Sequence, residues 1–325
     1  MSALRRALPW ALLVVAGAAL AAPEVPVTEL AKQARQGNAE ALESLQRLAG
    51  QDDMLALHHL GMLYLSGTGV PQSEARAAEF LRRAADMGHV PSAHNLAVVL
   101  ERAPDELRDP VAAARWYRHA AERGYARSQA NLGYLLAEGL GTARNLDEAR
   151  QWLEKAADQN QPRGLYLLGM LYLDGRGVER DDARAARLIR SAAERNERGA
   201  QLRLALLLQT GRGLERNEAQ ALEWLRKSAG QRLPEAQYLL AVVHAQGLHG
   251  VPRDAKVAAD WLRRSARQGH APAQYALGVA YYSGYGVPKD AEQALGWIAE
   301  AEKNGHPEAI QAMKQFREQR ARLRD

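Results

Sequence analysis

The stretch Ala273–Gly305, AQYALGVAYYSGYGVPKDAEQALGWIAEAEKNG, decides the fold because the chain carries seven variants of it in succession. Each copy has a leucine followed by Gly or Ala, and this pair recurs after 36 residues five times and then after 37. The leucines are Leu60, Leu96, Leu132, Leu168, Leu204, Leu240 and Leu277. A bulky, mostly aromatic column has the same spacings: Phe80, Trp116, Trp152, Leu188, Trp224, Trp261 and Trp297. Repetition at this period is typical of stacked helical hairpins.

The first half of each copy has the pattern of a helix that ends in a glycine turn. A small residue stands four positions before the leucine and a mostly apolar residue four positions after it, so all three share one helical stripe. Gly-x-Gly follows in five copies, as in Gly284 and Gly286, and glycine supplies the positive φ of such a turn. The second copy has Arg102-Ala103-Pro104-Asp105 there, which predicts a loop of different shape.

The second half of each copy predicts a second helix with a marked start and a marked end. Its N-cap positions are held by preferred capping residues: Ser73, Asp109, Asn145, Asp181, Asn217, Asp254 and Asp290. Its end positions are Gly88, Gly124, Asn160, Asn196, Arg232, Gly269 and Gly305. Gly and Asn tolerate the left-handed cap, so Arg232 is the exception. An alanine lies three positions before the aromatic column, and we expect both columns to pack in the core.

Stacked copies can bury these columns together, whereas a single copy cannot. This favours a solenoid over a compact helical bundle. We therefore predict an all-α solenoid of about seven 36-residue helix-turn-helix repeats with terminal capping helices.

The repeated pattern, A-x-x-x-L-G-x-x-Y-x-x-G-x-G-V and then D-x-x-x-A-x-x-W-L-x-x-A-A-x-x-G, resembles the Sel-one-like repeat, a relative of the tetratricopeptide repeat. The resemblance runs from Asp53 to about Glu308. It implies a right-handed α/α superhelix with first helices on the concave side. It also implies a role in assembly, envelope regulation or polysaccharide-export complexes.

The chain opens with the pattern of a secretory signal at residues 1–21. Arg5 and Arg6 precede an apolar run, and Ala19-Leu20-Ala21 predicts cleavage after Ala21. The apolar run is short for a membrane span, so an uncleaved anchor is the weaker alternative. We expect an exported, periplasmic bacterial protein, by the Sec or the twin-arginine route, with no transmembrane segment after cleavage. The chain has no cysteine, which argues against a lipoprotein and against disulfides.

The remaining boundaries follow from the repeats. Residues 22–52 are predicted to form a linker and degenerate N-terminal capping helices, in which Ala41 and Leu45 echo a first helix. Residues 53–308 hold the seven repeats, and residues 309–325 are predicted to form a C-terminal capping helix.

Charge argues against nucleic acid as the partner. The net charge is +5 and becomes +3 without Arg5 and Arg6, that is, 41 basic against 38 acidic residues. Charges of both signs alternate along the helices, which is typical of a solvated surface.

The sequence offers no pattern for catalysis, a cofactor or a metal. The histidines His89, His270 and His306 each follow an end-position glycine, so they read as turn residues. H-E-x-x-H, the P-loop pattern, S-x-x-K and G-x-S-x-G do not occur in the chain. We expect a protein without enzymatic activity, a hydrolase being the least favoured alternative.

The face of each first helix opposite the leucine is more apolar than a solvated face requires. At about 100° per residue, the positions two before and two after the leucine lie roughly opposite to it. Two interpretations are open: these side chains pack between adjacent first helices, or they line a groove for a protein segment. The candidate binding residues are His58, Met62, Tyr134, Tyr166, Met170, Tyr238, Tyr275, Val279 and Tyr282.

The sequence therefore predicts a scaffold or adaptor in the bacterial envelope that binds one or more envelope proteins on its concave face. The alternative is an accessory protein that binds carbohydrate or peptidoglycan. Tyr134 and Glu138, one helical turn apart, form the best aromatic-carboxylate pair for such a site.

Overall fold

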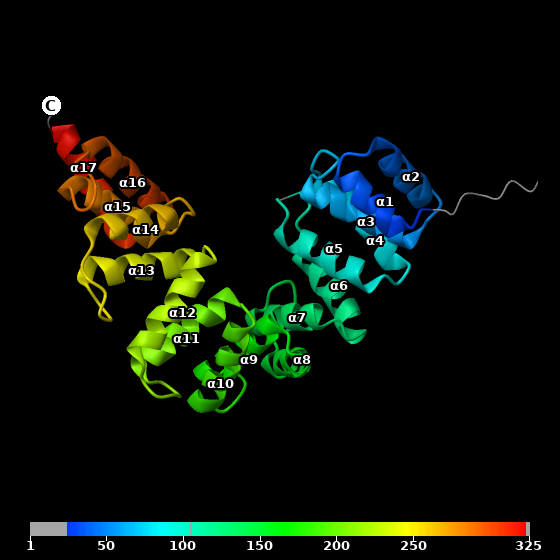
Figure 1. Ribbon diagram of the computed structural model, residues 1–325, viewed down its shortest axis with the longest axis horizontal. Coiled ribbons are helices and arrows are strands. Elements are labelled where there is room, and N and C mark those ends of the chain that lie inside the picture. Colours follow the sequence, from blue (N-terminus) through cyan, green and yellow to red (C-terminus); the bar gives the residue numbers. More distant parts are fainter. Residues whose placement is uncertain (1–24, 105, 323–325) are drawn as a thin grey trace, which may run out of the picture. The chain divides into compact units, whose positions relative to one another are not determined.

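The computed structural model describes residues 25–104 and 106–322, with side chains through residue 319. Every regular element within these ranges is an α-helix (Figure 1). The predicted signal at 1–21 and its cleavage site lie outside the described residues. The chain divides into two compact units, Met1–Met87 and Gly88–Asp325, which we describe separately.

The first unit contains four helices. They are α1 (Val27–Arg35), α2 (Ala39–Gly50), α3 (Met54–Ser66) and α4 (Glu74–Asp86). Helices α3 and α4 are the two halves of the first repeat. Helix α3 ends at Gly67 with φ of +66°, and the Ser73 side chain caps α4 by accepting from the backbone N–H of Arg76. The unit therefore has the helix-turn-helix form that the repeat predicts.

Helix α2 corrects one expectation about the N-terminal segment. Ala41 and Leu45 belong to a helix of the second type, since they lie 36 residues before Ala77 and Leu81 of α4 and are buried as those are. Asp52 ends α2 with φ of +58°, as end-position residues do. A small residue with a leucine one turn later occurs in both helix types, so that pair alone did not distinguish them. The shorter α1 packs against the same core as α2.

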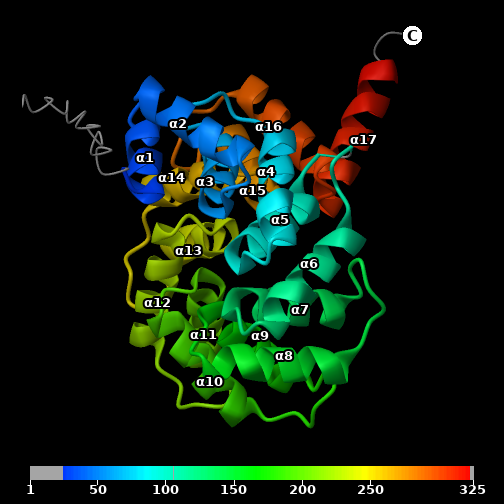
Figure 2. The ribbon, with the colours of Figure 1, turned by 90° about the vertical axis from the view of Figure 1, so that its right-hand side faces the viewer.

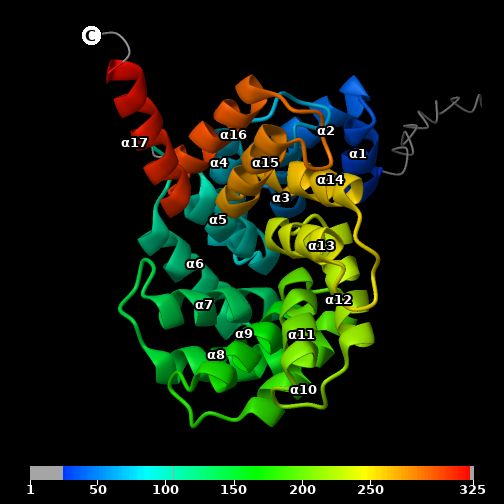
Figure 3. The same ribbon diagram turned by 90° about the vertical axis from the view of Figure 1, so that its left-hand side faces the viewer.

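The second unit contains six helical hairpins and a last single helix (Figure 2). Its helices are α5 (Val90–Arg102), α6 (Pro110–Glu122), α7 (Ala126–Glu138), α8 (Leu146–Asp158), α9 (Pro162–Asp174), α10 (Asp182–Glu194), α11 (Arg198–Thr210), α12 (Glu218–Gly230), α13 (Pro234–Gln246), α14 (Ala255–Ala266), α15 (Ala271–Ser283), α16 (Ala291–Lys303) and α17 (Pro307–Arg322). Each second helix packs on the first helix of its own repeat and on the first helix of the next, as α10 does with α9 and α11 (Figure 3). This is the predicted α-solenoid.

The predicted start and end positions of the second helices are confirmed. All seven predicted N-cap side chains accept a hydrogen bond from the backbone N–H three residues on. All seven end positions have positive φ, including Arg232 at +62°. The left-handed turn is therefore imposed by the stack, because arginine itself disfavours it by about 1 kcal/mol.

The leucine column is confirmed as core, but the aromatic column is not. Each of the seven leucines of this column is at most 3% exposed. The tryptophans are half-buried at the edge, where Lys155, Lys227 and Arg264 lie 4.0 to 4.4 Å from the ring centroids of tryptophans one turn earlier. In the first six repeats the buried member of the second helix is the next residue along, which is Leu or Ile except at Tyr117. The prediction that the aromatic column lies in the core was therefore wrong, because the residues directly after it fill the core instead.

The Gly/Ala column explains how the two helices of a repeat come so close. A Cβ added to Gly169 would lie 2.7 Å from Cγ1 of Ile189, and one added to Gly133 would lie 2.6 Å from Cγ of Leu153. Both distances are shorter than two carbon atoms allow. The branched side chain of the second helix therefore sits directly on the backbone of the first.

A column of buried glutamines, which the sequence analysis missed, joins successive repeats. Gln129, Gln201, Gln237 and Gln274 are at most 4% exposed. Each donates from its amide nitrogen to a second-helix carbonyl eight residues earlier, at 3.1 to 3.2 Å. Each also accepts at 2.8 Å from a side chain 30 or 31 residues later. Other copies have Leu57, Ala93 and Leu165 at this position, so the column is incomplete in the sequence.

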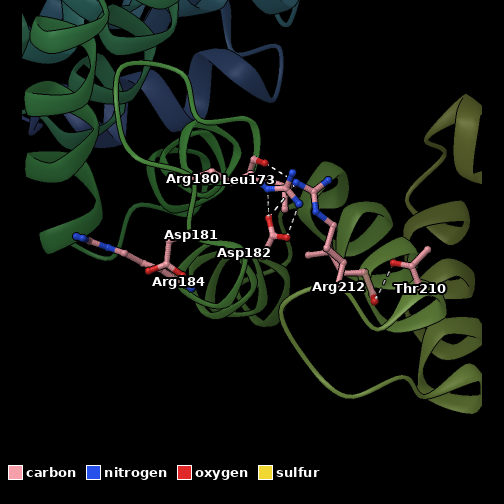
Figure 4. A network of polar contacts seen from close by, with 8 residues as sticks. Leu173, Arg180, Asp181, Asp182, Arg184, Thr210 and Arg212 are labelled. Carbon is pink, nitrogen blue, oxygen red and sulfur yellow. Dashed lines mark hydrogen bonds and ion pairs between the residues drawn. The ribbon is translucent and has the colours of Figure 1, made fainter.

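The middle residue of the Gly-x-Gly turn makes a second link between repeats. Arg212 donates to the carbonyl of Leu173 and to Asp182, the latter at 2.9 Å (Figure 4). Arg176 reaches the carbonyl of Ala137 at 2.9 Å, and the Tyr285 hydroxyl reaches that of Ala245 at 3.0 Å. These donors satisfy carbonyls that a helix leaves unpaired at its C-terminal end. The guanidiniums of Arg180 and Arg212 also hold the pKa of Asp182 well below its usual range.

Helix α17 is an eighth first helix without a second one. Ala309 and Met313 lie 36 residues after Ala273 and Leu277, and both are buried. Lys314 then takes the place of the glycine at position 278. Helix α17 therefore has the register of a first helix, with a long side chain at the position of the Gly/Ala column.

The close contact at Gly169 predicts that an alanine at this position destabilises the folded protein. We expect Gly169→Ala to lower the free energy of unfolding by about 1 to 2 kcal/mol, because Ile189 must move although alanine favours helix. The matched control is Gly296→Ala in α16, where an added Cβ meets no atom within 4 Å. That variant should be up to about 1 kcal/mol more stable. Urea unfolding of both checks this, and two variants of equal stability would contradict it.

The glutamine column predicts that the protein loses stability when one of these side chains is truncated. Gln201→Ala leaves a buried carbonyl and the Gln231 amide without their partner, which should cost about 1 to 3 kcal/mol. Gln151→Ala on the exposed side of α8 is the control and should change stability by less than about 0.5 kcal/mol. Thermal unfolding measures both, and an equally harmless Gln201→Ala would show that the column is not structural.

Candidate protein-binding surface

An apolar groove lies on the first-helix face at the C-terminal end of the stack. It has a volume of about 590 Å³ and runs over α13, α15 and the start of α17. Tyr238 and Val242 line it from α13, and Tyr275 and Val279 line it from α15. Val279 is 43% exposed, which is high for an apolar side chain between two helices. Three of the predicted binding residues, Tyr238, Tyr275 and Val279, therefore lie together.

The two tyrosines of this groove are held by the repeat that follows each of them. The Tyr238 ring lies 5.3 Å from the His270 ring, and the Tyr275 ring stacks on the His306 ring at 4.7 Å. Both histidines directly precede a first helix, as their place after an end-position glycine predicted. Burial lowers the pKa of His270. These rings therefore pack between repeats and also line the groove, and their role in binding a protein segment stays a prediction.

Three further predicted residues lie in the middle of the second unit. Tyr134 is half-buried on α7 and has the Arg163 guanidinium 5.3 Å from its ring centroid. Tyr166 and Met170 are half-buried on α9 against the core of the central repeats. Burial raises the pKa of Tyr166. Their packing between repeats is evident, and their role in binding stays a prediction.

The structure does not bring the last three predicted residues into the groove. Tyr282 is 75% exposed and lines a separate apolar hollow of about 570 Å³ among α15, α16 and α17. His58 and Met62 belong to α3 of the first unit, where both are half-buried. The His58 ring lies 5.3 Å from the His59 ring.

The second and third repeats hold a buried polar cluster that sequence reasoning did not find. His94 is 7% exposed, and its Nδ1 lies 2.9 Å from the Ser128 hydroxyl. Its ring also contacts the rings of Tyr117 and Tyr125, at 5.6 and 5.0 Å. Burial, with a smaller contribution from the charges of Arg127 and Arg163, lowers the pKa of His94 to about 4. The sequence feature that could have indicated this cluster is Tyr117, at a position where the other copies have Leu or Ile.

The described residues give little support to the other site types. No group of three or more His, Cys, Asp or Glu side chains among them is arranged to hold a metal ion. Glu138, proposed with Tyr134 for carbohydrate, is held by Arg176 at 2.8 Å. Within the described part of the chain, no helix has the length and hydropathy to cross a membrane.

Comparison with protein families gives one match. The Sel1 repeat model matches seven times, at residues 55–89, 90–125, 126–161, 162–197, 199–232, 234–270 and 271–306. These borders follow the hairpins described above. A comparison with curated protein sequences finds no match.

Solved structures are similar over most of the chain. A Sel1 repeat protein from Oxalobacter formigenes has 30% identity and a TM-score of 0.64, with 89% of this chain and 86% of that chain covered. A protective antigen of uropathogenic Escherichia coli has 31% identity and a TM-score of 0.57, with 88% and 66% covered. This chain therefore spans just under two thirds of the Escherichia coli protein. An immunity protein from Pseudomonas aeruginosa shares the fold at 20% identity, with 68% and 83% covered and a TM-score of 0.52.

The buried His94 predicts a stability that depends on pH. Its pKa is near 6.5 in the unfolded chain and about 4 in the folded one, so the unfolded state binds more protons between these values. The contribution is fully present above pH 6.5 and is lost as the pH falls towards 4. We expect a loss of about 2 to 3 kcal/mol over this window from His94.

The measurement is the free energy of unfolding of the wild type and of His94→Gln at pH 7.5 and pH 4.5. Titration of the carboxylates is common to both proteins and cancels in the comparison. The variant should lose clearly less stability on acidification than the wild type. Equal losses in the two proteins would contradict the burial of an uncharged His94.

Proposed function

We propose that this chain, which belongs to the Sel1 repeat family, is an adaptor that binds a segment of an envelope protein on the first-helix face of its second unit. Sel1 repeat proteins are generally protein-interaction scaffolds. The observation that carries the proposal is the apolar groove over α13, α15 and the start of α17, with Val279 exposed in it.

The groove has the composition of a peptide site. Tyrosines and aliphatic side chains supply most of its wall, and the polar lining residues include Ser283, His306 and Glu308. Aromatic anchors in an apolar centre with a polar rim are typical of protein interfaces. Each aliphatic side chain that a partner buries here contributes about 1.5 to 3 kcal/mol.

The envelope location is proposed from the sequence pattern at 1–21. A charged start, an apolar run and an A-x-A site support export, with cleavage after Ala21. The partner is accordingly sought among periplasmic and membrane-anchored proteins. Carbohydrate binding is less favoured, because the groove walls carry few of the carboxylate and amide groups that sugar hydroxyls require.

Site-specific crosslinking tests the proposal. A photo-reactive amino acid is placed at position 279 in the groove and, as a control, at position 111 on α6. Val111 is 48% exposed, which matches the 43% of Val279. In the native host we expect a discrete crosslinked protein from position 279 and none from position 111.

A second variant tests whether the apolar wall does the binding. Val279→Asp should abolish capture of that protein while the unfolding midpoint stays within a few degrees, because the side chain is exposed. Crosslinks of equal yield from both positions, or capture of glycan alone, would contradict the proposed function.

A further inference from the structure

Two arginines stand side by side on the first-helix face, away from the apolar groove. Arg127 on α7 and Arg163 on α9 both lie five residues before the leucine of their repeat, 36 residues apart. Helices α7 and α9 contact each other directly. At about 100° per residue, this position lies on the same face as Tyr134, roughly opposite the leucine. We call Arg127 and Arg163 the arginine pair.

No acidic side chain among the described residues lies within ion-pair distance of either member of the pair. Arg118 on the neighbouring α6 differs, because it is paired with Glu148. The nearby carboxylate of Glu138 is already bound by Arg176. The pair therefore presents uncompensated positive charge.

Both charges act at one place and one of them is oriented. Both guanidiniums contribute, after burial, to lowering the pKa of the same imidazole, that of His94. The Arg163 guanidinium lies over the Tyr134 ring at 5.3 Å, which restricts its directions. Arg127 is exposed and Arg163 is half-buried. A planar, oriented guanidinium is suited to bind a carboxylate through two parallel hydrogen bonds.

We infer that the partner segment carries acidic side chains, which bind the arginine pair while its apolar side chains fill the groove at α13 and α15. This inference rests on the proposed function, because it assigns a second contact to the same segment. A protein segment is favoured over a general polyanion, since only two positive charges are involved and an apolar groove lies on the same face.

The spacing of the repeats sets the spacing within the segment. Neighbouring packed helices lie 8 to 10 Å apart, so α9 and α13, two repeats apart, are separated by roughly 20 Å. An extended chain covers about 3.3 Å per residue, which corresponds to about six residues. The segment therefore has acidic residues and, about six positions away, apolar ones.

The test uses three fluorescein-labelled 14-residue peptides. The first has two glutamates and, six positions on, a leucine-phenylalanine pair. The second has glutamines in place of the glutamates, and the third has serines in place of the apolar pair. Each is titrated with the wild type, with Arg127→Glu/Arg163→Glu and with the control Arg115→Glu/Arg187→Glu. The first two peptides are also titrated with Val279→Asp. The control arginines are exposed on α6 and α10 and change the net charge equally.

We expect the first peptide to bind the wild type at least tenfold more tightly than the second. This preference should vanish in Arg127→Glu/Arg163→Glu, persist in the control and shrink between 50 and 300 mM salt. Thermal unfolding checks that both double variants are folded. The third peptide should bind weakly to all three proteins.

Other outcomes overturn the inference in distinguishable ways. Equal affinity of the first and second peptides, with binding still lost in Val279→Asp, refutes the acidic contact and leaves the apolar groove intact. No dependence on Val279 for any peptide refutes the proposed function as well. Binding of duplex DNA or anionic vesicles that depends on the arginine pair, without binding of the first peptide, assigns the pair to a polyanion instead.

Discussion

The contact between the Gly/Ala column of each first helix and the branched side chain of its second helix is the constraint on which the structure depends. At Gly169 and Ile189 the side chain lies so close to the backbone that a Cβ has no room. This contact sets the separation of the two helices in a hairpin, and with it the period at which hairpins stack.

Polar links between repeats add to an apolar core that runs from one repeat into the next. The buried glutamines and the Gly-x-Gly turn residues satisfy carbonyls at helix ends, which would otherwise be costly to bury. Because the hairpin contacts lie on the leucine side of each first helix, the opposite side is only partly needed for stacking. Tyr238 and Tyr275 illustrate this, with one side of each ring on a histidine and the other at the groove.

The parts of the fold that could be predicted from the sequence are those that recur and act locally. Asp181 caps α10 and Asn196 ends it, so the role of each could be predicted from the few residues around it. The depth of Trp224 could not be predicted, because a large ring with a polar edge can lie inside or at the rim, and Lys227 holds it at the rim. The role of Gln201 depends on carbonyls in neighbouring repeats. The sequence predicted which face of the first helices is apolar. It could not predict that Tyr282 and Val279 line different hollows, because this depends on where α16 and α17 pack.

Hydroxyl-radical footprinting of the captured complex, compared with the free chain, tests most directly whether partners bind on the first-helix face. Side-chain oxidation is read by mass spectrometry at the tyrosines of the first helices and at the half-buried tryptophans of the second helices. The account predicts protection of Tyr238 and Tyr275, and of Tyr134 beside the arginine pair, with Trp116, Trp152, Trp224 and Trp261 unchanged. Protection of the tryptophans with the tyrosines unchanged would contradict it.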